Sequence, residues 1–428
     1  MTAAAFTAVF LAALALALGV RIWLARRQVA HVAAHRDAVP AAFAGRIDAA
    51  AHRKAADYTI ARTRFGVVET IVDGIVLLAL TLGGALAALI GWTGSLTASP
   101  LWQDLALLVA VALVTGAIGL PLSYWQTFVL EARFGFNRTT LAVWVADLVK
   151  GTLVGAALGL PLAAVALWLM AAAGPLWWLW VWVVWIAFQV LVLALYPTVI
   201  APLFNKFSPL PEGPVRTRIE ALLARCGFAS RGLFVIDGSR RSSHGNAFFT
   251  GFGRTRRIVF FDTLIDRLAP DEIEAVLAHE LGHFKLRHVL KRMLWMAALS
   301  LAFLALLAWL IASPWFYEGL GTPAAFGRPG VALVLFFLVL PVFTFALGPL
   351  ASLYSRRHEF EADAFAARHA SAAALVHALV KLYQDNAATL TPDPLHSAFY
   401  DSHPPAAARV ARLESLADGA SPAATSPA

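Results

Sequence analysis

The chain has 428 residues, of which 60% are hydrophobic and only 14% are charged, and its mean hydropathy is +0.70. Since about a quarter of the residues of a soluble domain are charged, this composition excludes an ordinary soluble protein and indicates several membrane crossings. The single cysteine, Cys226, excludes a disulfide framework and a cysteine-rich metal site. The net charge of +8 does not indicate nucleic-acid binding, because the basic residues cluster beside apolar segments, where they set topology.

Seven segments are apolar over about the 20 residues that a bilayer core requires. They cover residues 4–25, 67–93, 104–128, 149–172, 176–203, 292–313 and 331–352. No basic residue precedes the first segment, so we expect a retained helix rather than a cleaved signal peptide. Lys and Arg are abundant in every second connection and scarce in the others. The positive-inside rule therefore puts the N-terminus outside and the C-terminus in the cytoplasm.

The predicted organisation has five parts. These are five helices with their loops (1–203), a first cytoplasmic polar segment (204–291), two further helices (292–352), a second cytoplasmic polar segment (353–418) and a disordered Ala/Ser/Pro-rich tail (419–428). Both polar segments lie on one side of the membrane, so they can form one domain. The abundance of Arg and Ala is typical of a GC-rich bacterial genome, which makes a bacterial inner membrane, with a periplasmic N-terminus, the predicted location.

The first polar segment contains signals for a small sheet and a helix. Residues 233–237 are typical of a buried strand, and residues 247–252 and 257–264 of a hairpin around the turn 253–256. Pro270 and the acidic residues after it predict the start of a helix.

The helix predicted after Pro270 carries the pattern His279-Glu280-Leu281-Gly282-His283. Residues four apart lie on one helix face, so both imidazoles can reach one metal, and Glu280 can hold a water molecule beside it. A catalytic zinc has three protein ligands and one open position, so a third ligand must come from elsewhere. On a continuous helix His288 falls off the ligand face, and we expect it to be a surface or packing residue.

The third ligand is expected between residues 356 and 363, on a helical stretch after the last apolar segment. Glu359 and Asp363 share a face, so one can bind zinc while the other accepts a hydrogen bond from a ligand imidazole. Glu361 is a rival ligand on another face. Spacing alone is equally typical of a solvated charged face.

These motifs together resemble one family. HELGH at 279–283 and SRRHEFEADAFA at 355–366 are similar to the Ste24 CAAX prenyl protease type I family of M48 zinc metallopeptidases. Further pieces match in order, namely FGFNRTT at 134–140, SSHGNAFFTGF at 242–252, RIVFFDTLI at 257–265 and DSHPP at 401–405 followed by Arg409. The resemblance covers nearly the whole chain and implies a barrel of seven transmembrane helices around a water-filled chamber, capped by a cytoplasmic zincin-like α+β catalytic domain.

The resemblance also implies roles for individual residues. One Zn²⁺ per chain is held by His279, His283 and Glu359, and Glu280 serves as general base and then as acid. Asp363 orients a zinc histidine, while His403 and Arg409 face the substrate. The implied substrate-binding edge strand consists of Asn246, Ala247, Phe248 and Phe249. The implied reaction is hydrolysis of hydrophobic or C-terminally prenylated (CAAX) peptides.

Three alternatives are distinguishable. An HtpX-like quality-control protease shares the mechanism, but the DSHPP element and the seven segments favour the Ste24 branch. A transporter places ionisable residues within its membrane segments, where this chain has chiefly Glu69 and Asp73. A zinc-stabilised scaffold needs no general base, so the presence of Glu280 argues against it.

Overall fold

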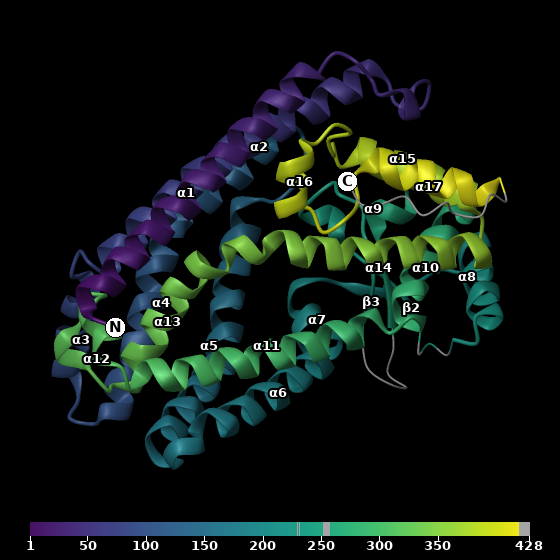
Figure 1. The fold of residues 1–428 in the computed structure, drawn as a ribbon. Helices are drawn as coiled ribbons and strands as arrows, with labels where there is room; N and C mark the ends of the chain where they lie inside the picture. Colours follow the sequence, from purple (N-terminus) through teal and green to yellow (C-terminus); the bar gives the residue numbers. More distant parts are fainter. Residues whose placement is uncertain (229, 231, 251–256, 419–428) are drawn as a thin grey trace.

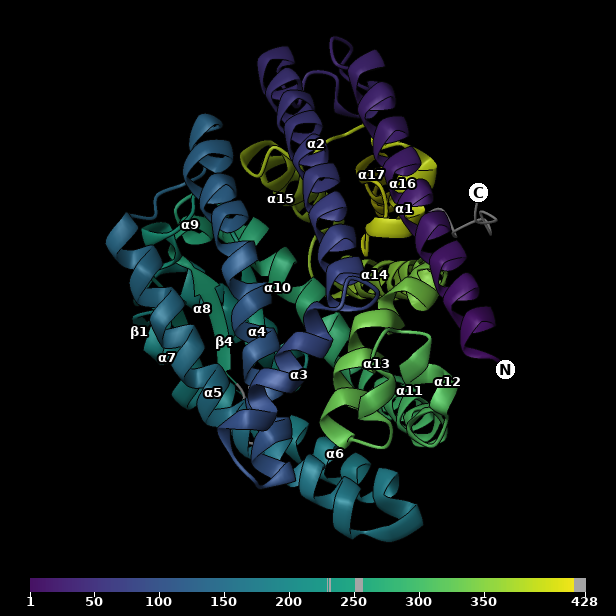
Figure 2. The same cartoon turned by 90° about the vertical axis from the view of Figure 1, so that its left-hand side faces the viewer.

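The computed structural model describes residues 1–228, 230, 232–250 and 257–418, and most of them are helical (Figures 1 and 2). The helices of the N-terminal half are α1 (Ala3–Ala34), α2 (Ala49–Leu80), α3 (Ala85–Leu96), α4 (Pro100–Trp125), α5 (Leu141–Ala172), α6 (Trp177–Leu195) and α7 (Ala201–Phe204). The later helices are α8 (Pro214–Arg225), α9 (Asp262–Ile265), α10 (Pro270–Lys285), α11 (His288–Ile311), α12 (Pro314–Glu318), α13 (Pro329–Thr344), α14 (Gly348–His369), α15 (Ala372–Asp385), α16 (Pro394–Tyr400) and α17 (Ala406–Ala417).

The membrane crossings agree with the predicted number once one bend is allowed for. Within the described residues, six helices are long and apolar enough to cross a membrane, and α2 with α3 makes a seventh crossing across a bend of 56°. The segment predicted at 67–93 is therefore not one straight helix. It breaks at residues 81–84, where Gly84 has a φ of +78° that other residues rarely adopt.

The two larger hydrophobic cores of the described residues lie in different parts of the molecule. The first core joins the membrane helices and includes Phe10 of α1, Leu107 of α4 and Phe316 of α12. The second core lies in the domain that contains the sheet, between α8, α10, α15 and α17. Phe43, in the connection between α1 and α2, is fully buried in this second core. The domain built around the second core lies beside the membrane helices (Figures 1 and 2).

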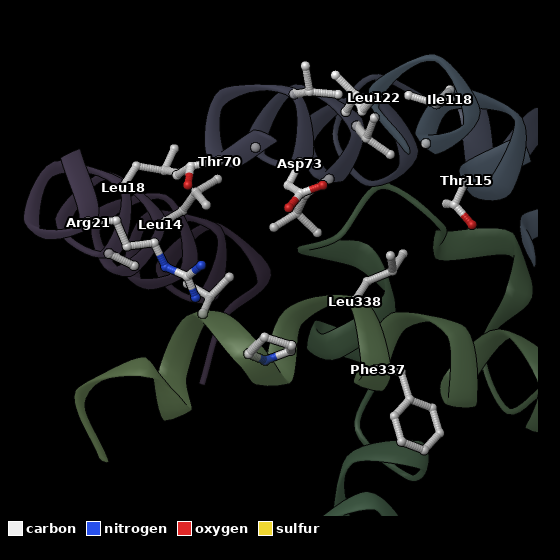
Figure 3. Close-up of a pocket in the computed structure, with 18 residues that line it drawn as sticks. Leu14, Leu18, Arg21, Thr70, Asp73, Thr115, Ile118, Leu122, Phe337 and Leu338 are labelled. Atoms are coloured by element: carbon white, nitrogen blue, oxygen red, sulfur yellow. The ribbon is translucent and has the colours of Figure 1, made fainter. Parts of the chain in front are cut away.

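A pocket of about 320 Å³ opens among α1, α2, α4 and α13 (Figure 3). Its lining is mainly apolar, with Leu14, Leu18 and Phe337 among its members, but Arg21 and Asp73 also line it. Asp73, one of the two acidic residues of the second crossing, is thus among the few charged residues that line this pocket.

A four-stranded sheet lies in the domain built around the second core. Its strands β1 (Phe207–Pro209), β2 (Leu233–Ile236), β4 (Arg257–Phe261) and β3 (Ala247–Thr250) lie in that spatial order. The pairs β1–β2 and β3–β4 are antiparallel, while β2 and β4 run parallel. The predicted hairpin is thus present with β3 at the sheet edge, and its second strand ends at Phe261, where α9 begins. The end of the first predicted strand and the predicted turn (251–256), and the predicted tail (419–428), lie outside the described residues.

Backbone and side-chain contacts join this domain to the membrane helices. Asn137, in the connection between α4 and α5, forms an antiparallel bridge with Ser242. Arg241 donates two hydrogen bonds to Asp147 of α5, at 2.7 and 2.9 Å, and one to Asn205 at 3.1 Å. The 134–140 loop therefore contacts the domain that contains the sheet.

Candidate metal centre

Helix α10 places two histidines on one face. Pro270 occupies its first turn, where the missing N–H costs nothing, and the Glu272 carboxylate accepts a hydrogen bond from Ala269 N at 2.8 Å. One turn separates His279 from His283, and their Nε2 atoms lie 3.2 Å apart. Glu280 follows His279 and is half-buried. The predicted helix and its start are present.

Helix α14 brings the carboxylate because it packs closely against α10. A Cβ on Gly282 would lie 3.0 Å from Ala362 Cα and 3.1 Å from Phe365 Cβ, so only glycine permits this approach. Glu359, one turn before Ala362, consequently faces both histidines. Its Oε1 lies 3.3 Å from His283 Nε2, and its Oε2 lies 3.6 Å from His279 Nε2.

These distances fit a tetrahedral metal. Ligands bound to zinc at about 2.0–2.2 Å are separated by roughly 3.3–3.5 Å, close to the three distances in this cluster. Glu359 Oε2 is buried and lacks a hydrogen-bond donor, although His403 Nδ1 approaches it to 2.7 Å in an unfavourable alignment. The two imidazole nitrogens and the Glu359 carboxylate lie close enough together to bind one cation. Among the described residues this group supplies three ligands, which leaves one position open.

The Nδ1 side of His279 is held by a buried carboxylate. His279 Nδ1 lies 2.8 Å from Asp363 Oδ1, and Arg409 binds both oxygens of Asp363 at 2.7 Å. Asp363 is only 1% exposed and Arg409 only 6%. Burial and the Arg409 cation favour a neutral ring, but hydrogen bonds to Asp363 and Glu359 outweigh them and raise the pKa of His279 above its usual value.

The two residues predicted to face the substrate both approach Glu359 Oε2, His403 through Nδ1 at 2.7 Å and Arg409 through Nη1 at 3.7 Å, but they differ in exposure. His403 precedes α17, and its side chain is 64% exposed, beside Glu359. The Arg409 guanidinium, in contrast, points at Asp363 and is buried. Arg412, one turn further along α17, lies over the Phe360 ring at 4.6 Å.

The Nδ1 side of His283 faces His288, for which the sequence predicts no role at the metal centre, and His288 in turn contacts Glu361, the rival ligand. The chain leaves α10 at Leu286 and turns at Arg287, whose φ is +58°, so α11 begins with His288 turned back toward α10. His288 Nδ1 lies 3.0 Å from His283 Nδ1, and its Nε2 lies 3.0 Å from Glu361 Oε2. The turn contains no Gly or Pro, so nothing in the sequence signals it. His288 is buried rather than at the surface, and Glu361 lies outside the His279, His283 and Glu359 group but forms a second cluster with His288 and His358.

The predicted substrate strand lies next to this helix pair. Ala247 and Phe248 belong to β3, whose backbone pairs with β4 on one side, and α10 lies beside β3. Asn246 is exposed, and its carbonyl accepts a hydrogen bond from Phe261 N at 2.9 Å. The other edge of β3 is a sheet edge, to which an extended peptide can add.

Comparison with known proteins defines the class first. Residues 28–206 match the sequence model of the CAAX prenyl protease N-terminal region with five membrane helices, and residues 209–417 match that of peptidase family M48. The first match indicates a membrane protein and the second a metallopeptidase, so the two matches together define a membrane metallopeptidase.

Individual relatives agree. The chain is 39% identical over 317 residues to "CAAX prenyl protease 1 homolog" of Oryza sativa subsp. japonica, covering 73% of each protein. It is 35% identical over 331 residues to "CAAX prenyl protease 1" of Saccharomyces cerevisiae, covering 74% of this chain and 73% of the yeast protein. The crystal structure of S. mikatae Ste24p superposes with a TM-score of 0.89 at 30% identity, covering 95% of this chain and 99% of that one.

The chain therefore belongs to the CAAX prenyl protease 1 (Ste24) family and is a membrane zinc metalloprotease. This confirms the family and the enzyme class predicted from the motifs. The match to the CAAX prenyl protease N-terminal model places the chain in the Ste24 branch rather than an HtpX-like one. The match to Ste24p over 95% of the chain also confirms the predicted fold class, a barrel of membrane helices around a chamber. The Oryza and Saccharomyces relatives are eukaryotic, and the predicted bacterial source stays a prediction.

Proposed function

We propose that this chain binds one zinc ion through His279, His283 and Glu359 and hydrolyses hydrophobic or C-terminally prenylated peptides beside it. The observation that carries the proposal is the cluster of two Nε2 atoms and one carboxylate at 3.2–3.6 Å on facing helices. When bound there, zinc supplies a Lewis acid that polarises the peptide carbonyl and acidifies water.

Glu280 performs the proton transfers. It follows a ligand on α10 and is half-buried, so its carboxylate is available to take a proton from the attacking water and deliver it to the leaving amine. His403 is exposed beside Glu359 and is the donor proposed for the developing oxyanion. For Arg409 the buried position supports a different role from the one that the resemblance implies, namely holding Asp363 against His279.

The substrate is proposed to bind as an added strand along the free edge of β3, from Asn246 to Phe249. Backbone hydrogen bonds of that kind give affinity with little sequence preference. The names of the relatives support a prenylated C-terminus as one substrate class, and the largely apolar pocket among the membrane helices is compatible with hydrophobic chains. The proposed topology keeps the N-terminus in the periplasm and this domain in the cytoplasm.

The test compares wild type with Glu280→Gln, using the purified full chain in lipid nanodiscs. Both are expected to hold about one zinc, while the variant loses about 10²–10⁴-fold in cleavage of a farnesylated CAAX peptide. Asp271→Asn, an exposed substitution in the first turn of the same helix, is the control and should cleave normally. The same peptide without its farnesyl group measures prenyl recognition. Zinc-loaded wild type that cleaves neither peptide would contradict the proposed substrate class.

A further inference from the structure

A series of polar contacts runs from Nδ1 of His283, one of the proposed zinc ligands, to the protein surface. It passes from His283 Nδ1 to His288 Nδ1 at 3.0 Å and from His288 Nε2 to Glu361 Oε2 at 3.0 Å. Glu361 Oε1 then accepts a hydrogen bond from Arg357 Nε at 2.9 Å. The mechanism proposed above uses none of the last three residues.

The proton on each ring follows from its neighbours. If His283 binds zinc through Nε2, that nitrogen carries no proton, so the neutral ring has its proton on Nδ1. Since His288 Nδ1 lies 3.0 Å away, it must accept this proton's hydrogen bond, and its own proton then resides on Nε2. That N–H points at the Glu361 carboxylate, which can only accept. One assignment satisfies all three groups.

We propose that His288 is the positioning residue of His283. It accepts the hydrogen bond from His283 Nδ1 and so fixes the tautomer and ring orientation of that proposed zinc ligand. Glu361 fixes the tautomer of His288 in the same way, so the carboxylate acts on His283 through the His288 ring. The proposal rests on the ligand set proposed above. Carboxylates commonly hold zinc histidines directly, and at this centre an imidazole is interposed.

The fold holds His288 in place independently of its hydrogen bonds. The ring stacks on His358 with centroids 4.0 Å apart and planes 7° from parallel, and the residue is only 4% exposed. The positive φ of Arg287 directs the start of α11 toward α10. Because stacking and backbone fix the ring, its nitrogen is presented to His283 before any metal binds.

A second metal ion is the rival reading, since atoms of His288, His358 and Glu361 lie within 4.8 Å of one another. A metal on His288 Nε2 would put that ring's proton on Nδ1. Two N–H groups, from His283 and His288, would then face each other at 3.0 Å. The proton arrangement therefore favours the relay over a second ion.

The experiment measures zinc affinity of the full chain in nanodiscs by competition with a chromophoric chelator, and the visible spectrum of the Co²⁺-substituted protein. His288→Phe keeps the stacking ring and removes both nitrogens, and we expect it to weaken zinc binding by about 10–100-fold and to change the Co²⁺ spectrum. His288→Asn puts an amide oxygen near the position of Nδ1, and we expect it to restore most of the affinity. This rescue would not occur if His288 served packing alone.

The outcomes separate this proposal from the ligand set. His283→Ala should abolish tight zinc binding, and unchanged affinity there would overturn the proposed ligands themselves. If His283→Ala loses zinc while folded His288→Phe binds it within twofold of wild type with the same Co²⁺ spectrum, only the relay fails. Two zinc ions per wild-type chain, reduced to one in His358→Ala, would also overturn the relay in favour of the second ion.

Discussion

The two histidines proposed to bind zinc have contrasting surroundings. His279 is held directly by Asp363, and Arg409 neutralises that carboxylate in the protein interior. His283 meets the neutral ring of His288, then Glu361 and finally Arg357, whose side chain is 78% exposed. His279 is thus supported by a buried ion pair, whereas His283 is supported by a series of polar contacts that ends at an exposed side chain. Damage to the first should therefore affect folding, and damage to the second should affect metal binding alone.

The largest effect is expected from Arg409→Met. The substitution leaves the buried Asp363 carboxylate without its cation, which should lower the free energy of unfolding by about 3–5 kcal/mol. Thermal unfolding of the purified protein measures this loss. Arg412→Met is the matched control, since it removes only a cation–π contact with Phe360, for about 0.5–1 kcal/mol. Equal losses for the two variants would contradict the assigned role of Arg409.

Gly282→Ala tests the position of Glu359 relative to both histidines, because Gly282 lies where α10 packs against α14. The new methyl would overlap Ala362 and Phe365, at a cost of about 1–3 kcal/mol that the better helix propensity of alanine offsets by about 1 kcal/mol. Displacement of α14 should move Glu359 from both histidines and weaken zinc binding roughly tenfold, as chelator competition can show. Gly151→Ala in α5 has open space and should leave zinc affinity unchanged. Undiminished affinity of the Gly282 variant would mean that the helices adjust freely.

Lowering the pH should release the metal because His279 becomes protonated. Hydrogen bonds to Asp363 and Glu359 raise the pKa of His279 in the metal-free protein, so protons compete for its Nε2 at a higher pH than for an ordinary histidine. Zinc affinity is fully present above that raised pKa and should fall by up to about tenfold per pH unit below it. Affinity measured between pH 8 and pH 5.5 gives the profile, and a flat profile down to pH 6 would refute it.

The smallest effect is expected from Arg357→Gln. Its ion pair with Glu361 is exposed and joins residues four apart on α14, a geometry worth about 0.3–0.5 kcal/mol. Zinc affinity should therefore change by less than about twofold. A loss as large as that expected for His288→Phe would show that the relay extends to the surface cation.

Local spacing explains what the sequence could predict. Two histidines four apart on a helix that begins at Pro270, and two acidic residues four apart on another, were enough to bring His279, His283, Glu359 and Asp363 together as candidates. The surroundings of His288 could not be predicted, because a positive φ at Arg287 breaks the helix without a Gly or Pro.

Hydropathy likewise located the crossings but not the helix ends. The first apolar segment stops near residue 25, yet α1 continues to Ala34. Residues 26–34 include two Arg, one Gln and one His and so are not an apolar run, but their Ala, Arg and Gln residues favour a helix. The 56° bend between α2 and α3 is also invisible to hydropathy, since both of its arms are apolar. The predicted role of Arg409 came from motif spacing, which says nothing about which side of α17 faces the metal.

The contacts of Arg241 bear on how the two halves of the chain stay together. This residue of the second half holds Asp147 and Asn205 of the first, and β1, just after the first half, pairs with β2. Glu212 follows β1, and its side chain is 83% exposed. Because these contacts do not depend on the peptide bond after Glu212, we expect the chain to tolerate a break there. Two polypeptides divided after Glu212 and produced together should assemble into one complex, which can be purified through a tag on either piece.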